Sequence, residues 1–184
     1  MTKKLTIAID AMGGENAPNK TIEGVYLFLK NYSSKSDFIL NLFGDENKIK
    51  GELSKYKVAQ ESIKITHTNS IVSDEETPLT AIKNSKNTSM WNCIKSQVDG
   101  DSNISLSAGN TGVLLVISRM ILKMMDEVSK PALAGLWPNE KGMSVVMDLG
   151  ANIECNEINL TDFAELGSAL YKSIFQNEKP LVGL

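Results

Sequence analysis

The stretch 103–125, NISLSAGNTGVLLVISRMILKMM, places three kinds of local structure in succession. Asn103–Leu106 is predicted to form a short strand, and Val113–Met125 has the apolar spacing of a helix. Between them, the turn Ser107–Gly112 contains two glycines, which let the backbone turn tightly and approach a ligand closely. A strand followed by a glycine turn and a helix is typical of folds in which strands and helices alternate.

The turn Ser107–Gly112 also has the composition of an anion site. Its Ser, Asn and Thr side chains can donate hydrogen bonds, and the first turn of a helix leaves backbone N–H groups without partners. The helix dipole favours negative charge at that end, so the turn could hold a phosphate group without a lysine. An ordinary corner with a helix cap explains the same residues equally well, because they match neither the dinucleotide-binding nor the P-loop pattern.

Outside this stretch the chain continues to alternate. The other predicted strands are Leu5–Asp10, Phe38–Phe43, Ser62–Thr66, Pro131–Leu136, Ser144–Leu149 and the final apolar segment Pro180–Leu184. The other predicted helices are Pro18–Tyr32, Glu46–Tyr56, Leu79–Val98 and Leu160–Phe175, the last capped by Asn159 or Thr161. The polar first half of Leu79–Val98 is either a solvated helix face or a loop between two helices. The alternation predicts a parallel α/β sheet with helices on both faces, formed by residues 1–184 as a single domain.

Three loops in this pattern contain glycine and follow predicted strands: Asp10–Gly14, Ser107–Gly112 and Asp148–Asn152. Ligands of parallel α/β sheets bind beyond the carboxyl ends of the strands. We therefore expect the three loops to lie at one edge of the sheet and to form an active site. Each loop alone could be a structural turn, so the prediction depends on their occurring together.

The composition disfavours several classes of partner. The 184 residues include 19 Lys and Arg and 22 Asp and Glu, which gives a net charge of −3. Aromatic residues make up 6% of the chain and its basic runs are short, which disfavours nucleic-acid binding and a polybasic membrane anchor. The apolar start before Asp10 is too short for a signal peptide, and no apolar run approaches the roughly 18 residues of a membrane span. We predict a cytoplasmic protein.

Cysteine and histidine are scarce. The chain has two cysteines, Cys93 and Cys155, and one histidine, His67. The cysteines are far apart in sequence, so we predict two buried, reduced thiols. A single histidine disfavours a Cys–His nucleophile, and the absence of a His/Cys cluster disfavours a metal centre, although carboxylates alone could hold magnesium. No metal and no cofactor are predicted.

At these loops the sequence resembles the bacterial phosphate acyltransferases of phospholipid synthesis, the PlsX family. The resemblance follows the family's order of motifs along the whole chain: Ile7–Gly14 with Ala17-Pro18, Ser107–Gly112, Pro131–Ala134, Asp148–Asn152, Phe163-Ala164, Gly167 and Val182–Leu184. Together these motifs are specific, although no single one would be. Members of the family are longer, so the chain is identified with the N-terminal part of the family fold, truncated relative to the whole.

The resemblance implies a Rossmann-like α/β/α sandwich related to isocitrate and isopropylmalate dehydrogenases. It implies a reaction in which inorganic phosphate attacks the thioester of a fatty acyl-acyl carrier protein. The products are acyl phosphate and free carrier protein, and the acyl phosphate feeds glycerol-3-phosphate acylation. The implied partners are acyl carrier protein, inorganic phosphate, a second copy in a homodimer and the downstream glycerol-3-phosphate acyltransferase. The resemblance also implies peripheral association with the inner face of the membrane.

The sequence departs from the family pattern at three positions. Asn16 stands where the family usually has a histidine after its Gly-Gly-acid motif, and Lys130 replaces an arginine before Pro-Ala-Leu-Ala. Lys83 replaces an arginine ahead of the segment Thr88–Met90. Lysine keeps the positive charge but lacks the planar fork with which arginine binds phosphate in a bidentate manner.

We expect phosphate to bind at the Ser107–Gly112 turn. Phosphate is already a competent nucleophile, so the protein needs chiefly to position it and to stabilise the oxyanion, and no catalytic triad is required. The candidate phosphate-binding residues are Gly13, Gly14, Lys83, Lys86, Ser107, Gly109, Asn110, Thr111 and Gly112. The candidate catalytic residues are Asp10, Asn110, Asp148 and Asn152. The aspartates would orient loop amides or lysines, or act as a general base; purely structural roles are the alternative.

Other functions stay open on the sequence alone. A phosphotransacetylase-like enzyme that uses coenzyme A would need the same phosphate chemistry, and only a comparison of thioester donors separates it. A non-catalytic, anion-binding fragment would bind phosphate without turnover. A nicotinamide dehydrogenase is the weakest alternative, because the chain lacks a G-x-G-x-x-G motif with a distal acid.

Overall fold

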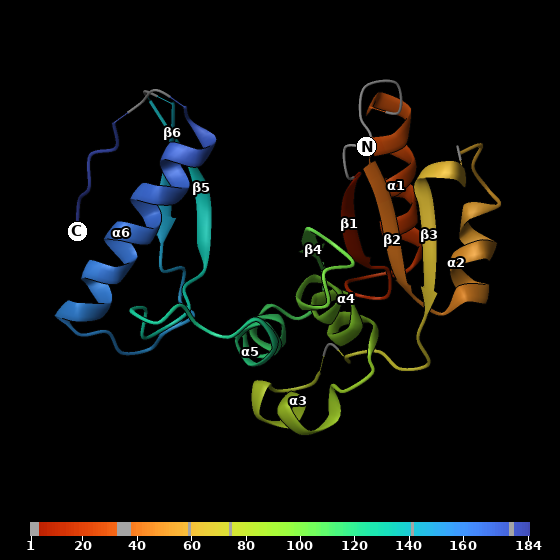
Figure 1. The fold of residues 1–184 in the computed structure, drawn as a ribbon, viewed down its shortest axis with the longest axis horizontal. Coiled ribbons are helices and arrows are strands. Elements are labelled where there is room, and N and C mark those ends of the chain that lie inside the picture. Colours follow the sequence, from red (N-terminus) through yellow and green to blue (C-terminus); the bar gives the residue numbers. More distant parts are fainter. Residues whose placement is uncertain (1–3, 33–37, 59, 74, 141, 177–178) are drawn as a thin grey trace. The chain divides into compact units, whose positions relative to one another are not determined.

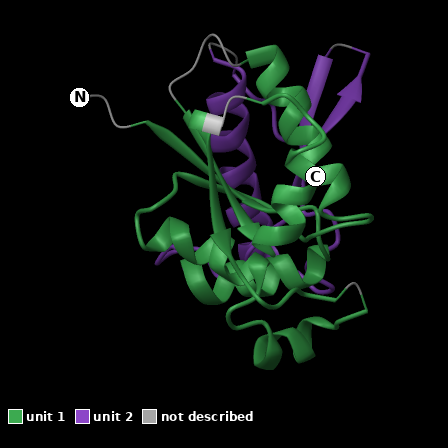
Figure 2. Cartoon of the chain, turned by 90° about the vertical axis from the view of Figure 1, so that its right-hand side faces the viewer, with its two compact units in different colours: residues 1–122 green, residues 123–184 purple. Residues whose placement is uncertain are grey.

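The computed structural model of the chain describes residues 4–32, 38–58, 60–73, 75–140, 142–176 and 179–184. It has two compact units, Met1–Leu122 and Lys123–Leu184 (Figure 2). Whether residues 1–184 act as a single domain stays a prediction.

The first unit contains the parallel sheet. Its strands are β1 (Leu5–Asp10), β2 (Phe38–Gly44), β3 (Ile63–His67) and β4 (Ile104–Leu106). Its helices are α1 (Asn19–Tyr32), α2 (Glu46–Leu53), α3 (Pro78–Asn84), α4 (Ser89–Val98) and α5 (Thr111–Leu122), with a 3₁₀ turn at Gln60–Ser62. All three strand pairs are parallel, and the strand order is β3-β2-β1-β4 (Figure 1). The predicted parallel sheet is confirmed for these strands.

Side-chain alternation along the strands gives this sheet two covered faces. Leu40 and Leu42 of β2 belong to a core that includes Ile22 of α1. Phe43 lies on the opposite face of the same strand, because successive side chains alternate, and it packs with Cys93 of α4. Helices therefore cover both faces, and the predicted α/β/α sandwich is confirmed.

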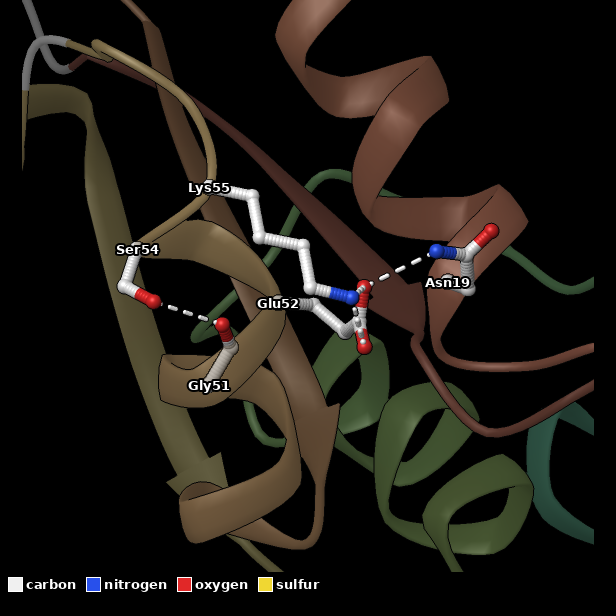
Figure 3. Close-up of polar contacts among 5 residues, drawn as sticks. All are labelled: Asn19, Gly51, Glu52, Ser54 and Lys55. Atoms are coloured by element: carbon white, nitrogen blue, oxygen red, sulfur yellow. Dashed lines mark hydrogen bonds and ion pairs between the residues drawn. The ribbon is translucent and has the colours of Figure 1, made fainter.

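Polar contacts around Glu52 hold the start of α1 against the end of α2 (Figure 3). Asn19 Nδ2 donates to Glu52 Oε2 at 2.9 Å, and Lys55 Nζ donates to both carboxylate oxygens at 2.8 and 2.7 Å. The hydrogen bond from Lys55 and then that from Asn19 lower the pKa of Glu52. At the same end of α2, Ser54 Oγ donates to the carbonyl of Gly51 at 2.7 Å. These contacts position the first turn of α1, which matters for the site.

The polar segment before α4 is a loop between two helices rather than one solvated helix face. Thr77 caps α3 by accepting from the N–H of Thr80, and Thr88 caps α4 by accepting from the N–H of Trp91. A threonine N-cap starts a new helix because its side chain satisfies an otherwise unpaired N–H. The helices α3, α4 and α5 then share a core of Ala81, Met90, Ile94, Val113 and Ile117.

The bounds of α5 and α2 differ from the sequence expectation. α5 begins at Thr111 and ends at Leu122, earlier at both ends than the predicted Val113–Met125. α2 ends at Leu53, short of the predicted Tyr56, because the chain leaves the helix after the C-cap Ser54.

The second unit contains β5 (Ala134–Asn139), β6 (Gly142–Met147) and α6 (Glu157–Ile174). β5 and β6 pair antiparallel as a sheet of their own, so the expectation that this pair of strands continues the parallel sheet is wrong. The connection between Asn139 and Gly142 is far shorter than the crossover that a parallel pair needs. The sequence pattern indicated two strands correctly but not their direction.

Two further expectations for this unit are corrected. α6 is capped by Asn156, whose side chain accepts from the N–H of Asn159, so neither Asn159 nor Thr161 is the N-cap. Asn159 is the reciprocal partner in this capping box, three residues into the motif. The final segment Pro180–Leu184 has no strand structure, and Leu181 and Leu184 are fully exposed. No described strand pairs with that segment.

Candidate active site

The strand order of the first unit creates a crevice between β1 and β4. From β1 the chain adds β2 and β3 on one side and then crosses over to add β4 on the other. Ligands of doubly wound sheets bind beyond the carboxyl ends of the strands at such a reversal. A cavity of about 370 Å³ lies at this point, lined by Ile9, Asp10, Gly13, Gly14, Glu15, Lys20, Thr21, Leu106, Ser107 and Ala108.

The two loops that border this cavity are joined by Asp10 and Ser107. Asp10 ends β1, and only 2% of its surface is exposed. Its Oδ2 accepts from Ser107 Oγ at 2.7 Å, and its Oδ1 accepts from the N–H of Met12 at 3.2 Å. Ser107 Oγ in turn accepts from the N–H of Gly109 at 3.1 Å. One carboxylate therefore organises both its own loop and the loop that follows β4.

Gly13 and Gly14 are needed because the loops approach each other so closely. A Cβ on Gly13 would lie 2.6 Å from Asp10 Oδ2 and 2.9 Å from both Gly109 N and Ser107 Oγ. Gly14 has φ +91°, which residues with side chains rarely adopt, and its Cβ would lie 2.8 Å from the carbonyl oxygen of Ala108. The structure thus brings these predicted glycines together with Asp10, Ser107 and Gly109.

Sequence reasoning missed the charged pair at the rim of the cavity. Lys20, in the first turn of α1, lies with its Nζ 3.5 Å from Glu15 Oε2, and the two side chains are 58% and 87% exposed. Among the lining residues, all of which the structure describes, Lys20 is the only cation. Its position two residues after Pro18 could have indicated it, because a helix that follows a loop at the carboxyl edge directs its first turn towards that edge.

Asn110 precedes α5, Thr111 and Gly112 are its first residues, and none of the three lines the cavity. Asn110 Oδ1 accepts from the N–H of Val113 at 3.1 Å, so Asn110 serves as a helix cap, and its Nδ2 donates to the carbonyl of Glu76 at 3.1 Å. A Cβ on Gly112 would lie 3.2 Å from Cγ of Pro78, the first residue of α3. The structure gives these residues a connecting role, and their predicted contact with phosphate stays a prediction.

Lys83 and Lys86 are exposed and lie apart from the lining of the cavity. Lys83 is in the last turn of α3, and Lys86 is in the loop between α3 and α4. Neither belongs to the residues that line the crevice between β1 and β4. Their role as a source of positive charge for phosphate stays a prediction.

In the second unit, Asp148 closes a loop through hydrogen bonds from amides. Its Oδ1 accepts from the N–H of Leu133 at 2.8 Å, and its Oδ2 accepts from the N–H of Asn152 at 2.8 Å and from Asn152 Nδ2 at 3.0 Å. Asn152 Nδ2 also donates to the carbonyl of Pro131 at 2.7 Å. Burial raises the pKa of Asp148, but the hydrogen bonds, first from Leu133 and then from Asn152, outweigh burial and lower the pKa.

Of the three loops predicted to meet, Asp10–Gly14 and Ser107–Gly112 do so. The loop Asp148–Asn152 follows β6, a strand of the antiparallel pair. The expectation that this loop follows a strand of the parallel sheet is therefore wrong. Within the second unit it is bound to the motif Pro131–Ala134 instead. A catalytic role for Asp148 and Asn152 stays a prediction.

The described residues contain no group of three or more His, Cys, Asp or Glu side chains that could hold a metal ion. Cys93 is buried, and burial, followed by the charge of Asp10, raises its pKa to about 12. Cys155 is exposed, so the prediction of two buried thiols is wrong for that residue. None of the helices that the structure describes is both long enough and apolar enough to cross a membrane.

Comparisons with known proteins agree with the motifs. The family model described as Fatty acid synthesis protein matches residues 5–184. Proteins named phosphate acyltransferase from Pelagibacter ubique, Maricaulis maris and Parvibaculum lavamentivorans are 46%, 37% and 39% identical to this chain over its whole length. The alignments cover 54%, 52% and 50% of those relatives, so the chain spans about half the length of the curated relatives it matches. The chain therefore belongs to the fatty acid synthesis protein family, and its resemblance to phosphate acyltransferases is confirmed.

Proposed function

We propose that the chain is the phosphate-binding part of an acyltransferase that moves an acyl group from acyl carrier protein to inorganic phosphate. The observation that carries the proposal is the cavity between the Asp10–Gly14 loop and Ser107, at the point where the strand order reverses. The name of the relatives, phosphate acyltransferase, supports phosphate as the acceptor. The carrier-protein donor rests on the resemblance of the motifs.

The proposed reaction needs little from the protein beyond placement. A phosphate oxygen attacks the carbonyl carbon of the thioester, a C–O bond forms and the C–S bond breaks. The electron pair of that bond leaves with the sulfur, which takes up a proton and becomes the free thiol of the donor. The protein would hold phosphate next to the thioester and stabilise the oxyanion of the tetrahedral intermediate.

The candidate residues fall into two groups in this proposal. Lys20, Gly13, Gly14 and Ser107 would hold phosphate in the cavity, with Asp10 positioning Ser107. Lys83, Lys86, Gly109, Asn110, Thr111 and Gly112 are kept as further phosphate-binding candidates from the sequence. Asp148 and Asn152 are kept as candidates on the donor side.

The proposal extends to the setting of the reaction. A cytoplasmic enzyme, homodimeric and peripheral to the inner face of the membrane, would receive acyl groups from an acidic carrier protein. It would then pass acyl phosphate to a glycerol-3-phosphate acyltransferase. These partners rest on the family resemblance.

The test is a phosphate-dependent transfer assay on the 184-residue chain. Purified chain, checked for folding by circular dichroism, is mixed with radiolabelled phosphate and either acyl-acyl carrier protein or acyl-coenzyme A. We expect labelled acyl phosphate and free thiol in equal amounts with the carrier-protein donor. Turnover only with acyl-coenzyme A would support the phosphotransacetylase-like alternative, and phosphate binding without any turnover would support the anion-binding fragment.

A further inference from the structure

The hydrogen-bond arrangement of Ser107 restricts what can bind beside it. A serine hydroxyl has one proton to donate and two lone pairs that accept. The proton of Ser107 is given to Asp10 Oδ2 at 2.7 Å, and one lone pair accepts from the N–H of Gly109 at 3.1 Å. What Ser107 can still offer to the cavity that it lines is a lone pair, which accepts a hydrogen bond.

The carboxylate behind Ser107 reinforces this restriction. Asp10 is almost fully buried, and an ionised carboxylate only accepts hydrogen bonds. Glu15, at the rim, is a second acceptor, and Lys20 is the single cation among the lining residues. An oxyanion in this cavity therefore meets one cationic side chain, and the oxygen of it that approaches Ser107 faces a hydrogen-bond acceptor, so that oxygen must carry its own proton.

We infer that Asp10 and Ser107 make the cavity selective for protonated oxyanions, so that it takes hydrogen phosphate and hydrogen arsenate but rejects sulfate. The inference rests on the proposed phosphate site and adds to it the residues that determine specificity. At neutral pH, hydrogen phosphate and hydrogen arsenate keep at least one proton, whereas sulfate, of similar size and shape, keeps none. Sulfate at this place would leave the Ser107 lone pair without a donor and would set two acceptors against each other.

The experiment is competition for phosphate binding by the intact chain. Radiolabelled phosphate is equilibrated by dialysis against the protein at neutral pH, with unlabelled phosphate, arsenate or sulfate added at constant ionic strength. We expect arsenate to compete about as well as phosphate. Sulfate should compete at least about tenfold more weakly, because an unpaired acceptor opposite a buried carboxylate is costly.

The variant Asp10→Asn tests whether the carboxylate sets this preference. The new amide would donate to Ser107 Oγ and release the serine proton to the cavity, so sulfate should then compete within about threefold of phosphate. The matched control is Asp101→Asn, which removes an exposed carboxylate ahead of β4 and should keep the preference against sulfate. If Asp10→Asn folds poorly, the competition experiment on the wild-type chain still tests whether the cavity rejects sulfate.

The outcomes separate this inference from the proposed function. Phosphate binding with equal competition by sulfate overturns the inference and leaves the proposed function standing. No saturable phosphate binding overturns the proposed phosphate site, and the inference with it. A folded Asp10→Asn variant that still rejects sulfate overturns the assignment of the selectivity to Asp10. Loss of selectivity in Asp10→Asn, with selectivity kept in Asp101→Asn, supports that assignment.

Discussion

Asp10 ends β1 and Asp148 follows β6, and each begins a loop with glycine, but their carboxylates have different partners. Asp10 accepts from a serine hydroxyl that lies 97 residues away in sequence and that also borders a cavity. Asp148 accepts from amides of Leu133 and Asn152, within its own compact unit. The first carboxylate is linked to a group that can still contact a ligand, whereas the second is linked to groups that only donate.

This difference shows that the role of an acidic loop residue depends on which kind of group donates a hydrogen bond to its carboxylate. An amide N–H has nothing left to offer once it donates, so the bonds to Asp148 close a loop. A hydroxyl that donates keeps its lone pairs. Because Ser107 donates its proton to Asp10, it can only accept a hydrogen bond from a ligand in the cavity. The short pattern of an aspartate followed by glycine cannot distinguish the two cases.

The largest expected loss of stability comes from Gly13→Ala, in the loop that Asp10 begins. The new methyl group would collide with Asp10 Oδ2, Gly109 N and Ser107 Oγ at 2.6–2.9 Å, so we expect a loss of about 3 kcal/mol in the free energy of unfolding. Gly24→Ala is the matched control, because its Cβ meets nothing within 4 Å and alanine favours the helix by about 0.5–1 kcal/mol. Urea titration measures both, and equal stability of the two variants would contradict the crowding.

The next largest loss of stability is expected in the second unit, from Asp148→Asn. An amide NH₂ would face the donors of Asn152, and we expect a loss of about 2 kcal/mol in the stability of the second unit at neutral pH. The chain has two tryptophans, Trp91 in the first unit and Trp137 in the second, so fluorescence in a Trp91→Phe background reports the second unit alone. An unchanged unfolding midpoint there would show that the amide bonds to Asp148 contribute little.

The same comparison can be sharpened by changing the pH. Hydrogen bonds lower the pKa of Asp148 in the folded state, so its contribution to stability is complete above the usual pKa of an aspartate. The contribution is lost as the pH falls through the lowered, folded-state pKa. The stability difference between wild type and Asp148→Asn should therefore shrink on acidification, measured by urea titration in the same background from neutral pH to about pH 3. A difference that stays constant over that range would exclude a lowered pKa.

The smallest effect on stability is expected from Lys20→Ala. Its ion pair with Glu15 is exposed, so the free energy of unfolding should change by less than about 0.5 kcal/mol. Phosphate affinity should nevertheless fall about two- to fivefold, whereas Lys48→Ala, near the start of α2 and away from the cavity, should leave affinity unchanged. The double variant Lys83→Ala/Lys86→Ala in the same dialysis assay shows which lysines serve the anion. A fall in affinity for that variant alone would move the site towards α3.

The sequence predicted the parallel sheet well because each of its strands is a short apolar run set off by turns. It also indicated Asp10, Gly13, Gly14 and Ser107, since residues that end parallel strands share one edge. It could not indicate that β5 and β6 pair antiparallel, because apolar periodicity carries no strand direction.

The finer features of the site depend on contacts between distant residues. That Ser107 donates to Asp10 follows from the pairing of β1 with β4, which places Ile7 beside Ile104. The cap role of Asn110 was available from its position before a helix, but its bond to Glu76 was not. The position of Lys20 in the first turn of α1 could be expected from Pro18, but the bond from Asn19 to Glu52 that fastens this turn could not.

The pairing of β1 with β4 also has a consequence for the time course of folding. β1 pairs with β2 across a short span of chain, Leu5 with Phe38, whereas it meets β4 through Ile7 and Ile104. Contacts between distant residues require the closure of a longer loop and form more slowly than local ones. β4 has three residues, so its pairing with β1 forms few hydrogen bonds to offset the entropy cost of closing that loop. We therefore expect refolding to complete β1, β2 and β3 first, and the cavity to acquire its Ser107 wall in the last step.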